Sequence, residues 1–216
     1  LHCAAGSGNT AIARMLLEAG ADSDQADRNG QFDVSPLYVA CYNNRLAMVQ
    51  LLLDKGAAMD TANNAPLHAA ATAGHTDTVR LLLDRGSKSL HAVNKSGQTA
   101  LHLAAVAGHT ATAELLLDSG ADISAPDGNG DTPAHLAAAK GHADTLALLL
   151  SKGVDVNAAD ETGFTLLHAA AHGGNADVCE LLLDKGADIA AADDENSSPI
   201  HEAAGFGDIA TVELLL

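Results

Sequence analysis

The chain has 216 residues, 47% of them hydrophobic but only 2% aromatic, and its formal net charge is −17. A core of this composition has to be built from many close Ala and Leu contacts, because few large rings are present. The negative charge and the lack of a basic stripe argue against binding to nucleic acid, which requires Lys and Arg to neutralise phosphates. No apolar run reaches the roughly 18 residues of a membrane helix, so we expect no membrane insertion.

The three cysteines, Cys3, Cys41 and Cys179, are widely spaced and form no CxxC pair. This pattern is typical of buried thiols in a reducing compartment rather than of a disulfide framework. We therefore expect an intracellular protein of the cytoplasm, with the nucleus as the alternative compartment. The chain begins at Leu1 and not at a Met, so an upstream targeting peptide stays an alternative.

A short motif recurs along the whole chain at nearly constant spacing. It begins at residues 1, 37, 67, 101, 134, 167 and 200, so that successive copies lie 36, 30, 34, 33, 33 and 33 residues apart. A period near 33 combined with helix-length apolar segments predicts one array of stacked units. We expect seven units, approximately 1–26, 27–62, 63–93, 94–126, 127–159, 160–192 and 193–216, of which the first and last are incomplete.

Each unit opens with a short helix whose start and end are marked in the sequence. A hydroxyl followed by Pro, as in Ser35-Pro36 and Thr132-Pro133, places an N-cap before the first helical residue. Ala65-Pro66 lacks the hydroxyl, which should cost about 1 kcal/mol. Gly, or Asn44 in the second unit, ends this helix because both residues tolerate the left-handed conformation.

A second helix and a turn complete the unit. In "DTVRLLLDRG" we expect Val79, Leu82 and Leu83 to form the buried stripe and Gly86 to end the helix. The turn that follows, as at residues 127–130, ends in Gly or Asn, which indicates a positive φ. Ala-rich helix faces approach closely, and stacking buries an apolar face that one helix pair cannot bury alone.

The motif Asp-x-x-Gly-x-Thr-Pro-Leu-His-x-Ala-Ala, then Gly-His, then Val-x-Leu-Leu-Leu-x-x-Gly-Ala-Asp resembles that of ankyrin-repeat proteins over essentially the whole chain. The stretch "DGNGDTPAHLAAAKGHADTLALLLSKGVDVNAA" from Asp127 follows it almost throughout. The resemblance implies an all-α fold, a curved solenoid of stacked antiparallel helix pairs joined by projecting β-hairpin-like loops. It also implies binding of other proteins in a concave groove formed by the loop tips and first helices.

Two neighbouring loops depart from the motif. Phe32-Asp33-Val34 is a three-residue insertion, whereas the linker "MDTANNAPLH" is about three residues short. We expect an enlarged loop around residues 31–35 and a stunted loop around 59–66. Neutral drift in surface loops and a functional notch in the groove are the two alternative explanations for these irregular loops.

Six of the eleven histidines occupy one motif position, and we interpret them as structural. The six are His2, His68, His102, His135, His168 and His201. Tyr38 in the same position supports this interpretation, because Tyr is a poor zinc ligand. His75, His109 and His142 follow the helix-ending Gly and are expected to cap the second helix or to contact loops. No HExxH motif, CxxC pair, nucleophile elbow or phosphate loop is present, so we expect no metal, no cofactor, no catalytic residues and no enzyme activity.

The residues before Asn157, "LLSKGVDV", resemble the stretch that asparaginyl hydroxylases accept in ankyrin domains. Hydroxylation of Asn157 is one interpretation. The other is that Asn157 bonds within its own loop, as Asn commonly does.

The motif places candidate partner-binding residues at the loop tips and on the exposed side of the first helices. Phe164 stands out, because the other units have polar residues at its position and because interface anchors are enriched in aromatic residues and Arg. The full candidate set is Arg28, Gln31, Tyr42, Lys95, Gln98, Val106, Asp131, Lys140, Phe164, His172 and Phe206. The alternative for Tyr42 and Phe206 is packing within their own repeats.

Two function hypotheses lead, and a third is remote. The first is a protein-binding scaffold or adaptor whose partner is unidentified and for which a basic surface is electrostatically easier to accept. The second is a regulatory or targeting segment of a larger enzyme or channel, with further domains of the same polypeptide as partners. The expected exposure of Leu214, Leu215 and Leu216 favours a longer chain. The third is a metal-binding or catalytic domain.

Overall fold

A computed structural model describes residues 1–26, 34–60 and 65–216. These residues form fourteen α-helices arranged in seven pairs, which we number repeats 1 to 7, and one short 3₁₀ helix, Ser89–His91. The first helices are α1 (His2–Ser7), α3 (Pro36–Tyr42), α5 (Pro66–Thr72), α7 (Ala100–Val106), α9 (Pro133–Ala139), α11 (Leu166–His172) and α13 (Pro199–Phe206). The second helices are α2 (Thr10–Glu18), α4 (Leu46–Asp54), α6 (Thr76–Asp84), α8 (Thr110–Asp118), α10 (Ala143–Ser151), α12 (Ala176–Asp184) and α14 (Ile209–Leu215).

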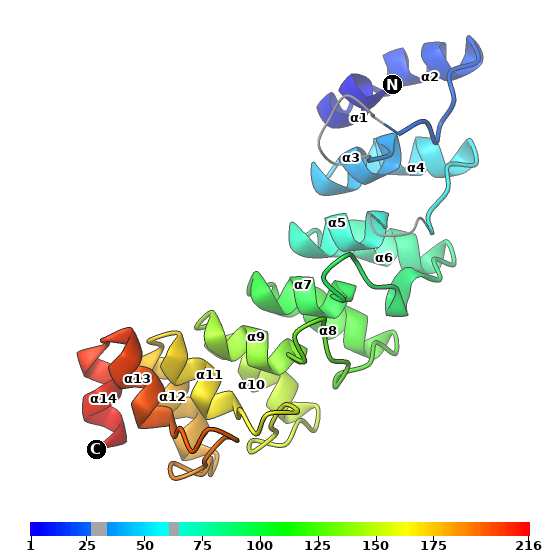
Figure 1. The fold of residues 1–216 in the computed structure, drawn as a ribbon. Helices are drawn as coiled ribbons and strands as arrows, with labels where there is room; N and C mark the ends of the chain where they lie inside the picture. Colours follow the sequence, from blue (N-terminus) through cyan, green and yellow to red (C-terminus); the bar gives the residue numbers. More distant parts are fainter. Residues whose placement is uncertain (27–33, 61–64) are drawn as a thin grey trace.

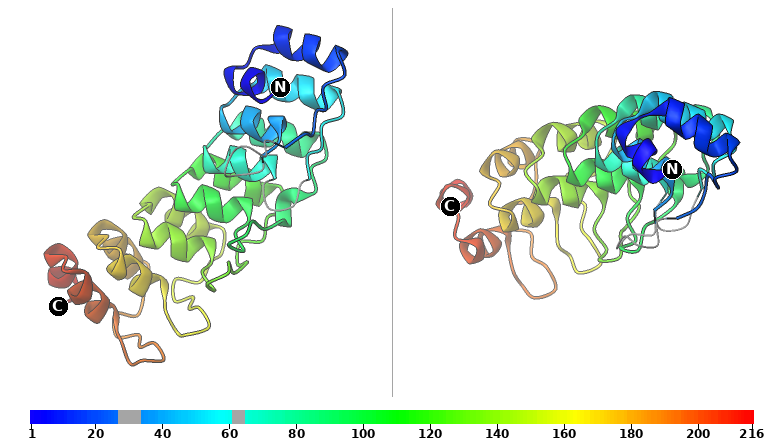
Figure 2. Two further views of the ribbon diagram at one scale, coloured as in Figure 1. Left: turned by 45° about the horizontal axis from the view of Figure 1, so that its top comes forward. Right: turned by 90° about the horizontal axis from the view of Figure 1, so that it is seen from above.

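The pairs stack in chain order into an elongated, curved array with the two termini at opposite ends (Figure 1). Seen from above, the array has two layers of helices, and the long loops project from one side (Figure 2). Each first helix contacts its own second helix and the first helices of the neighbouring repeats. The expected all-α solenoid is therefore confirmed. Its buried hydrophobic residues form two clusters, one in repeats 1 to 4 and one in repeats 4 to 7, and the partly buried Leu117 packs against both.

The loops turn as hairpins without forming strands in the described part of the chain. In repeats 5 to 7 a loop Asp donates its backbone N–H to the carbonyl four residues later, at 2.8 Å for Asp127 and Asp131 and 3.0 Å for Asp160 and Phe164. An isolated antiparallel bridge joins Ala159 and Thr165. Asn44 and Asn196 have φ angles of 54° and 59°, as expected for Asn at the positions where other repeats carry Gly.

The core is made of small residues and Leu. In α6, Val79 and Leu82 are fully buried as expected, but Leu83 is only partly buried and Thr78 is buried in its place. The Thr78 hydroxyl donates to Asn44 Oδ1 of the preceding repeat at 3.2 Å. Equivalent threonines make hydroxyl pairs between repeats, Thr76 with Thr112 and Thr110 with Thr145, both at 2.8 Å. Hydrogen bonding makes burial of these polar groups tolerable.

At the C-terminal end, the expectation that Leu214, Leu215 and Leu216 are all exposed is wrong for two of them. Leu215 is buried and Leu214 is partly buried, because both pack against the core of the last repeats. Leu216 is 90% exposed.

In repeats 4 to 6 the motif histidines connect each repeat to the next, which confirms their structural interpretation. In repeat 4, His102 Nδ1 accepts a hydrogen bond from the Thr99 backbone N–H at 3.1 Å and lies 2.8 Å from the Thr99 hydroxyl. His102 Nε2 lies 3.1 Å from the Asp131 carbonyl oxygen in repeat 5, so Nε2 carries the proton that it donates. His135 and His168 repeat this arrangement with the carbonyls of Phe164 and Ser197, each at 3.1 Å.

Repeat 3 is the exception, because Ala65 stands at its cap. His68 Nε2 still donates to a carbonyl, that of Ala92 at 2.9 Å, but His68 Nδ1 is buried without a hydrogen-bond partner. An unsatisfied buried acceptor costs about 1–3 kcal/mol. Repeat 3 is therefore a weak point of the array.

Replacing Ala65 by Thr should stabilise the protein by about 1 kcal/mol. The new hydroxyl would cap α5 and donate to His68 Nδ1, as Thr99 does with His102. The matched control is Thr99→Ala, which should lower the free energy of unfolding by a similar amount. Urea titrations of both variants measure the effect, and an unchanged or lower midpoint for Ala65→Thr would show that the missing cap hydroxyl does not weaken repeat 3.

Acid should weaken the array in the pH range of histidine. Burial lowers the pKa of His68, His102 and His135 below the usual value near 6.5. The unfolded chain therefore binds more protons than the native chain once the pH falls below about 6.5, and the free energy of unfolding decreases. The urea midpoint should drop between pH 7.5 and pH 5.5, and less steeply in a His102→Gln variant. Equal midpoints at both pH values would show that these histidines do not control stability.

Candidate partner-binding surface

In repeats 4 to 7, the residues that directly precede the N-cap of each first helix form a row along the loop side of the array. These residues are Gln98, Asp131, Phe164 and Ser197. The backbone carbonyls of the last three accept the histidine hydrogen bonds described above. The row is therefore attached to the core in repeats 5 to 7, and its side chains are presented at the spacing of the repeats. We call it the finger row.

Neighbouring loops are also bonded to each other. The Gly128 N–H donates to the Ser96 carbonyl at 2.8 Å, and the Asp194 N–H donates to the Thr162 carbonyl at 2.9 Å. A Cβ at Gly128 would lie 2.8 Å from the Ser96 oxygen, so glycine permits this close approach. These bonds join the loop of repeat 4 to that of repeat 5, and the loop of repeat 6 to that of repeat 7.

Carboxylates at the starts of the hairpins stabilise the turns. Asp160 Oδ1 accepts hydrogen bonds from the backbone N–H groups of Thr162 at 2.8 Å and Phe164 at 2.9 Å, and from the Thr162 hydroxyl. Although burial opposes ionisation, these bonds hold the pKa of Asp160 below its usual value. In contrast, burial and then repulsion from Asp127 raise the pKa of Asp131.

The candidate residues from the sequence differ in how exposed they are. Lys95, Lys140 and His172 are exposed, whereas Gln98, Val106, Asp131 and Phe164 are partly buried. Arg28 and Gln31 lie outside the described residues, as do residues 27–33 and 61–64 of the two irregular loops, so the enlarged and stunted loops stay predictions.

Tyr42 and Phe206 are both exposed but also take part in packing. Tyr42 is 50% exposed, and its ring stacks on Tyr38 of the same helix with centroids 6.5 Å apart. Phe206 is 60% exposed and lies against Gly174 of the preceding repeat, where a Cβ would be 2.5 Å from the ring. Tyr42 thus packs within its own repeat, and Phe206 packs between two.

Phe164 belongs to a cluster that joins repeats 6 and 7. Its ring centroid lies 5.2 Å from that of His168 and 6.4 Å from that of His172, which it meets edge-on. His172 Nδ1 lies 2.9 Å from Glu202 Oε2, and the Ser197 hydroxyl donates to Glu202 Oε1 at 3.1 Å. The sequence analysis missed Glu202, which directly follows a motif histidine. Leu103 and Leu136 occupy the same position in earlier repeats and are partly buried.

This cluster does not have the geometry of a nucleophilic site. The Ser197 hydroxyl donates to Glu202, so the carboxylate separates it from the imidazole that would have to take its proton. Burial raises the pKa of Cys41, and raises that of Cys179 to about 12, which disfavours the reactive thiolate of either residue. Within the described ranges, no three His, Cys, Asp or Glu side chains are grouped so that they could hold a metal ion.

A second row of side chains follows the helix-ending glycines. His75, His109 and His142 do not cap their own helices through their side chains, which corrects the capping alternative. Their Nε2 atoms instead lie 3.0–3.1 Å from carbonyl oxygens of the preceding repeat, those of Tyr42, Thr72 and Val106. These residues therefore hold the repeats together.

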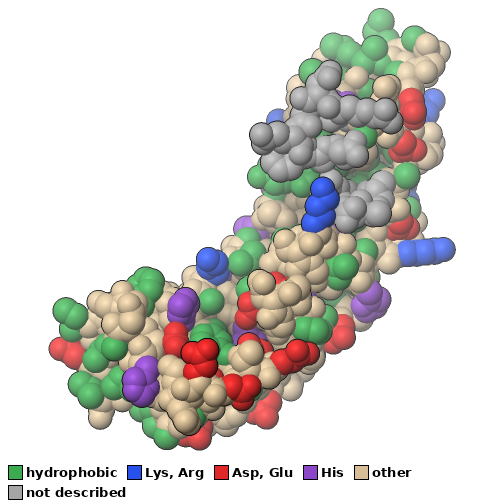
Figure 3. Space-filling model, in the orientation of Figure 1, with side chains coloured by type: hydrophobic (Ala, Val, Ile, Leu, Met, Phe, Trp, Pro, Cys, Tyr) green, Lys and Arg blue, Asp and Glu red, His purple; other side chains and the backbone are tan. Residues whose placement is uncertain are grey.

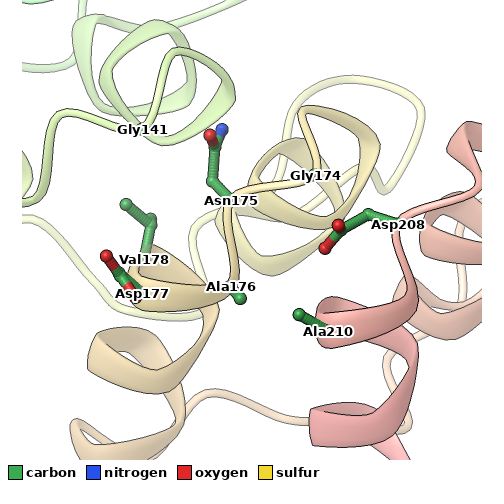
Figure 4. Close-up of a pocket in the computed structure, with 8 residues that line it drawn as sticks. All are labelled: Gly141, Gly174, Asn175, Ala176, Asp177, Val178, Asp208 and Ala210. Atoms are coloured by element: carbon green, nitrogen blue, oxygen red, sulfur yellow. The ribbon is translucent and has the colours of Figure 1, made fainter.

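In repeats 6 and 7 the same position carries Asn175 and Asp208, which line a shallow cleft with Gly141 and Gly174 (Figure 4). The Asn175 amide donates to the carbonyls of Ala138 and Ala139, both at 2.9 Å. Asp208 instead caps its own helix through the Thr211 N–H at 2.8 Å. The residues of this cleft thus serve the structure of the array.

Asn157 is exposed, and its side chain bonds to the next repeat. Its Oδ1 accepts from the Asp188 N–H at 2.8 Å, and its Nδ2 lies 3.5 Å from the Gly186 carbonyl oxygen. The interpretation that the Asn157 side chain bonds within its own loop is corrected, because both contacts cross to the segment that follows α12 in repeat 6. Hydroxylation of Asn157 stays a prediction.

The chain is similar to known proteins along its whole length. The family model described as "Ankyrin repeats (3 copies)" matches residues 1–63, 37–127, 88–160 and 135–216, and therefore the whole chain. No described helix combines the length and apolar character that crossing a bilayer requires.

Several curated proteins are similar over part of their length. Tyrosine-protein kinase HTK16 of Hydra vulgaris is 39% identical over 88 residues, which is 38% of this chain and 11% of the kinase. Palmitoyltransferase ZDHHC13 of Mus musculus is 42% identical over 78 residues, 34% of this chain and 12% of that protein. A transient receptor potential cation channel subfamily A member 1 homolog of Caenorhabditis elegans is 35% identical over 102 residues, 46% of this chain and 8% of the channel. The matches thus span about a tenth of these relatives.

Proposed function

Because the chain belongs to the ankyrin-repeat family, we propose that it is an intracellular scaffold or adaptor that binds a partner protein along the finger row and the exposed side of the first helices. Ankyrin repeats are protein-interaction modules, so the general class of function follows from the family. The choice of this surface is our inference.

One observation supports the surface more than any other. Three residues of the finger row, Asp131, Phe164 and Ser197, are hydrogen-bonded to core histidines through their backbone carbonyls, while the side chains of the row differ from repeat to repeat. Gln98, Asp131, Phe164 and Ser197 occupy equivalent positions but have different chemistry. A rigid backbone with variable side chains loses little conformational entropy on binding and can still be specific.

A second role is favoured by the relatives. The matched segments are small parts of a kinase, a palmitoyltransferase and a channel. The same surface could then serve as a regulatory or targeting segment of a larger enzyme or channel and bind other domains of its own polypeptide. The physical requirement on the surface is the same in both roles, because a protein segment has to lie across several repeats.

The proposal predicts that Phe164→Ala weakens partner binding more than it weakens folding. Peptides selected from a random displayed library against the 216-residue chain serve as probes, and calorimetry measures their affinity. Loss of a partly buried aromatic anchor should reduce affinity by roughly tenfold or more, about 1–2 kcal/mol.

The matched control is Leu46→Ala, which removes a 41% exposed apolar side chain from α4 in the second layer. Its affinity should equal that of the unchanged chain. Failure to select any peptide, or equal losses in the two variants, would count against the proposed surface. A melting temperature that falls by several degrees in Phe164→Ala while affinity holds would show that the ring is structural only.

A further inference from the structure

The charge of the chain is concentrated in its C-terminal half. Residues 1–100 contain nine Asp and Glu and eight Lys and Arg, whereas residues 101–216 contain nineteen acidic and three basic residues. The space-filling view shows acidic side chains gathered over the loops of the later repeats (Figure 3). A partner segment that lies across repeats 5 to 7 therefore meets a strongly negative potential.

The three basic side chains of this half do not neutralise the finger row. Lys152, which directly follows α10, pairs with Asp118 at the end of α8 at 2.7 Å, and Lys185 directly follows α12 in the same layer of second helices. Lys140 follows α9, whereas Asp131 precedes it. A seven-residue helix, roughly 10 Å long, separates these two residues along the chain.

Asp131 is a carboxylate in an unfavourable environment. Its partial burial raises its pKa, and repulsion from Asp127 and Asp160 acts in the same direction, whereas His135 and His102 act to lower this pKa. In the part of the chain that the structure describes, no Lys or Arg lies within ion-pair distance of Asp131. A cation from a partner would relieve this repulsion, and a partly desolvated ion pair is stronger than an exposed one.

Next to Asp131 in the finger row stands Phe164, with the exposed His172 beside its ring. Glu202 lies beyond, 21% exposed, and holds the orientation of His172 through Nδ1. A flat cation could therefore stack on an aromatic face while it bonds to a neighbouring carboxylate. The guanidinium of Arg does both, whereas the compact ammonium of Lys does not stack and is more strongly hydrated.

We propose that this part of the surface, formed by Asp131, Phe164, His172 and Glu202, receives an arginine side chain from a basic segment of the partner protein. The inference rests on the proposed function, because it assumes that the finger row is the binding surface. Beyond the proposed function, the inference specifies that the C-terminal half of the array binds the partner and that the recognised side chain is arginine.

The test uses short fluorescent peptides in which Arg, Lys or Glu is spaced among Gly and Ser, with anisotropy measured at about 0.15 M salt. The Arg peptide should bind at least about fivefold more tightly than the Lys peptide, and the Glu peptide should not bind. Asp131→Asn and Phe164→Ala should each weaken the Arg peptide about tenfold.

Asp144→Asn is the matched control, because it makes the same charge change in the same half but in the first turn of α10. Its effect should stay below about twofold, since salt screens charges beyond roughly 8 Å. Asp131→Asn removes no packed ring, so it keeps the test valid if Phe164→Ala unfolds. Absence of Arg binding, equal Arg and Lys affinities, or an equal loss in Asp144→Asn would overturn the inference.

The library selection described above separates the two proposals. Selected peptides that lack Arg, or that bind independently of Asp131 and Phe164, would overturn the arginine site and leave the proposed function standing. A selection that enriches no peptide would remove the proposed function itself.

Discussion

The hydrogen bond from a histidine Nε2 of one repeat to a backbone carbonyl of the next is the interaction on which the rest of this structure depends. In repeats 4 to 6 it runs from His102, His135 and His168 to the residue before the following cap. The other ring nitrogen, Nδ1, is hydrogen-bonded to the Thr that caps the same helix. The ring therefore has one tautomer and one orientation. Each histidine thus joins a helix start, a loop and a neighbouring repeat.

This arrangement explains how a core of Ala and Leu can support an elongated molecule. Small side chains let the helices approach closely, and each repeat is stabilised only by its neighbours. The buried hydroxyl pairs of the second helices and the residues after the helix-ending glycines add polar links at the same interfaces. Because the interfaces hold the backbone, side chains on the loop side are free to vary, and Asp131 and Phe164 can differ without disturbing the fold.

Much of the fold could be predicted from the sequence, because it follows from local rules repeated seven times. The period, the caps at Thr99 and Thr132, and the Asn residues with positive φ all depend on a few adjacent residues. The contacts that the sequence analysis missed join residues about thirty positions apart. The Glu202–His172 pair and the Asn157–Asp188 bond belong to this class, since neither motif position implies a partner across the interface.

The candidate surface was predictable in outline and not in detail. Motif position placed Phe164 at a loop tip and His172 on the exposed side of a first helix, but only the structure shows that they form one cluster with Glu202. Leu215 was misjudged for a related reason, because its burial depends on the three-dimensional packing of the last repeats and not on its distance from the end of the chain.

The central claim, that each repeat is stabilised through its bonds to the next, is tested most directly by residue-level hydrogen exchange in a His135→Leu variant. The account predicts faster exchange of amides in the loop and first helix of repeats 5 and 6, on both sides of the lost bond to Phe164, with protection retained in repeats 2 and 3. Faster exchange confined to α9 alone, or an equal loss of protection along the whole array, would contradict it.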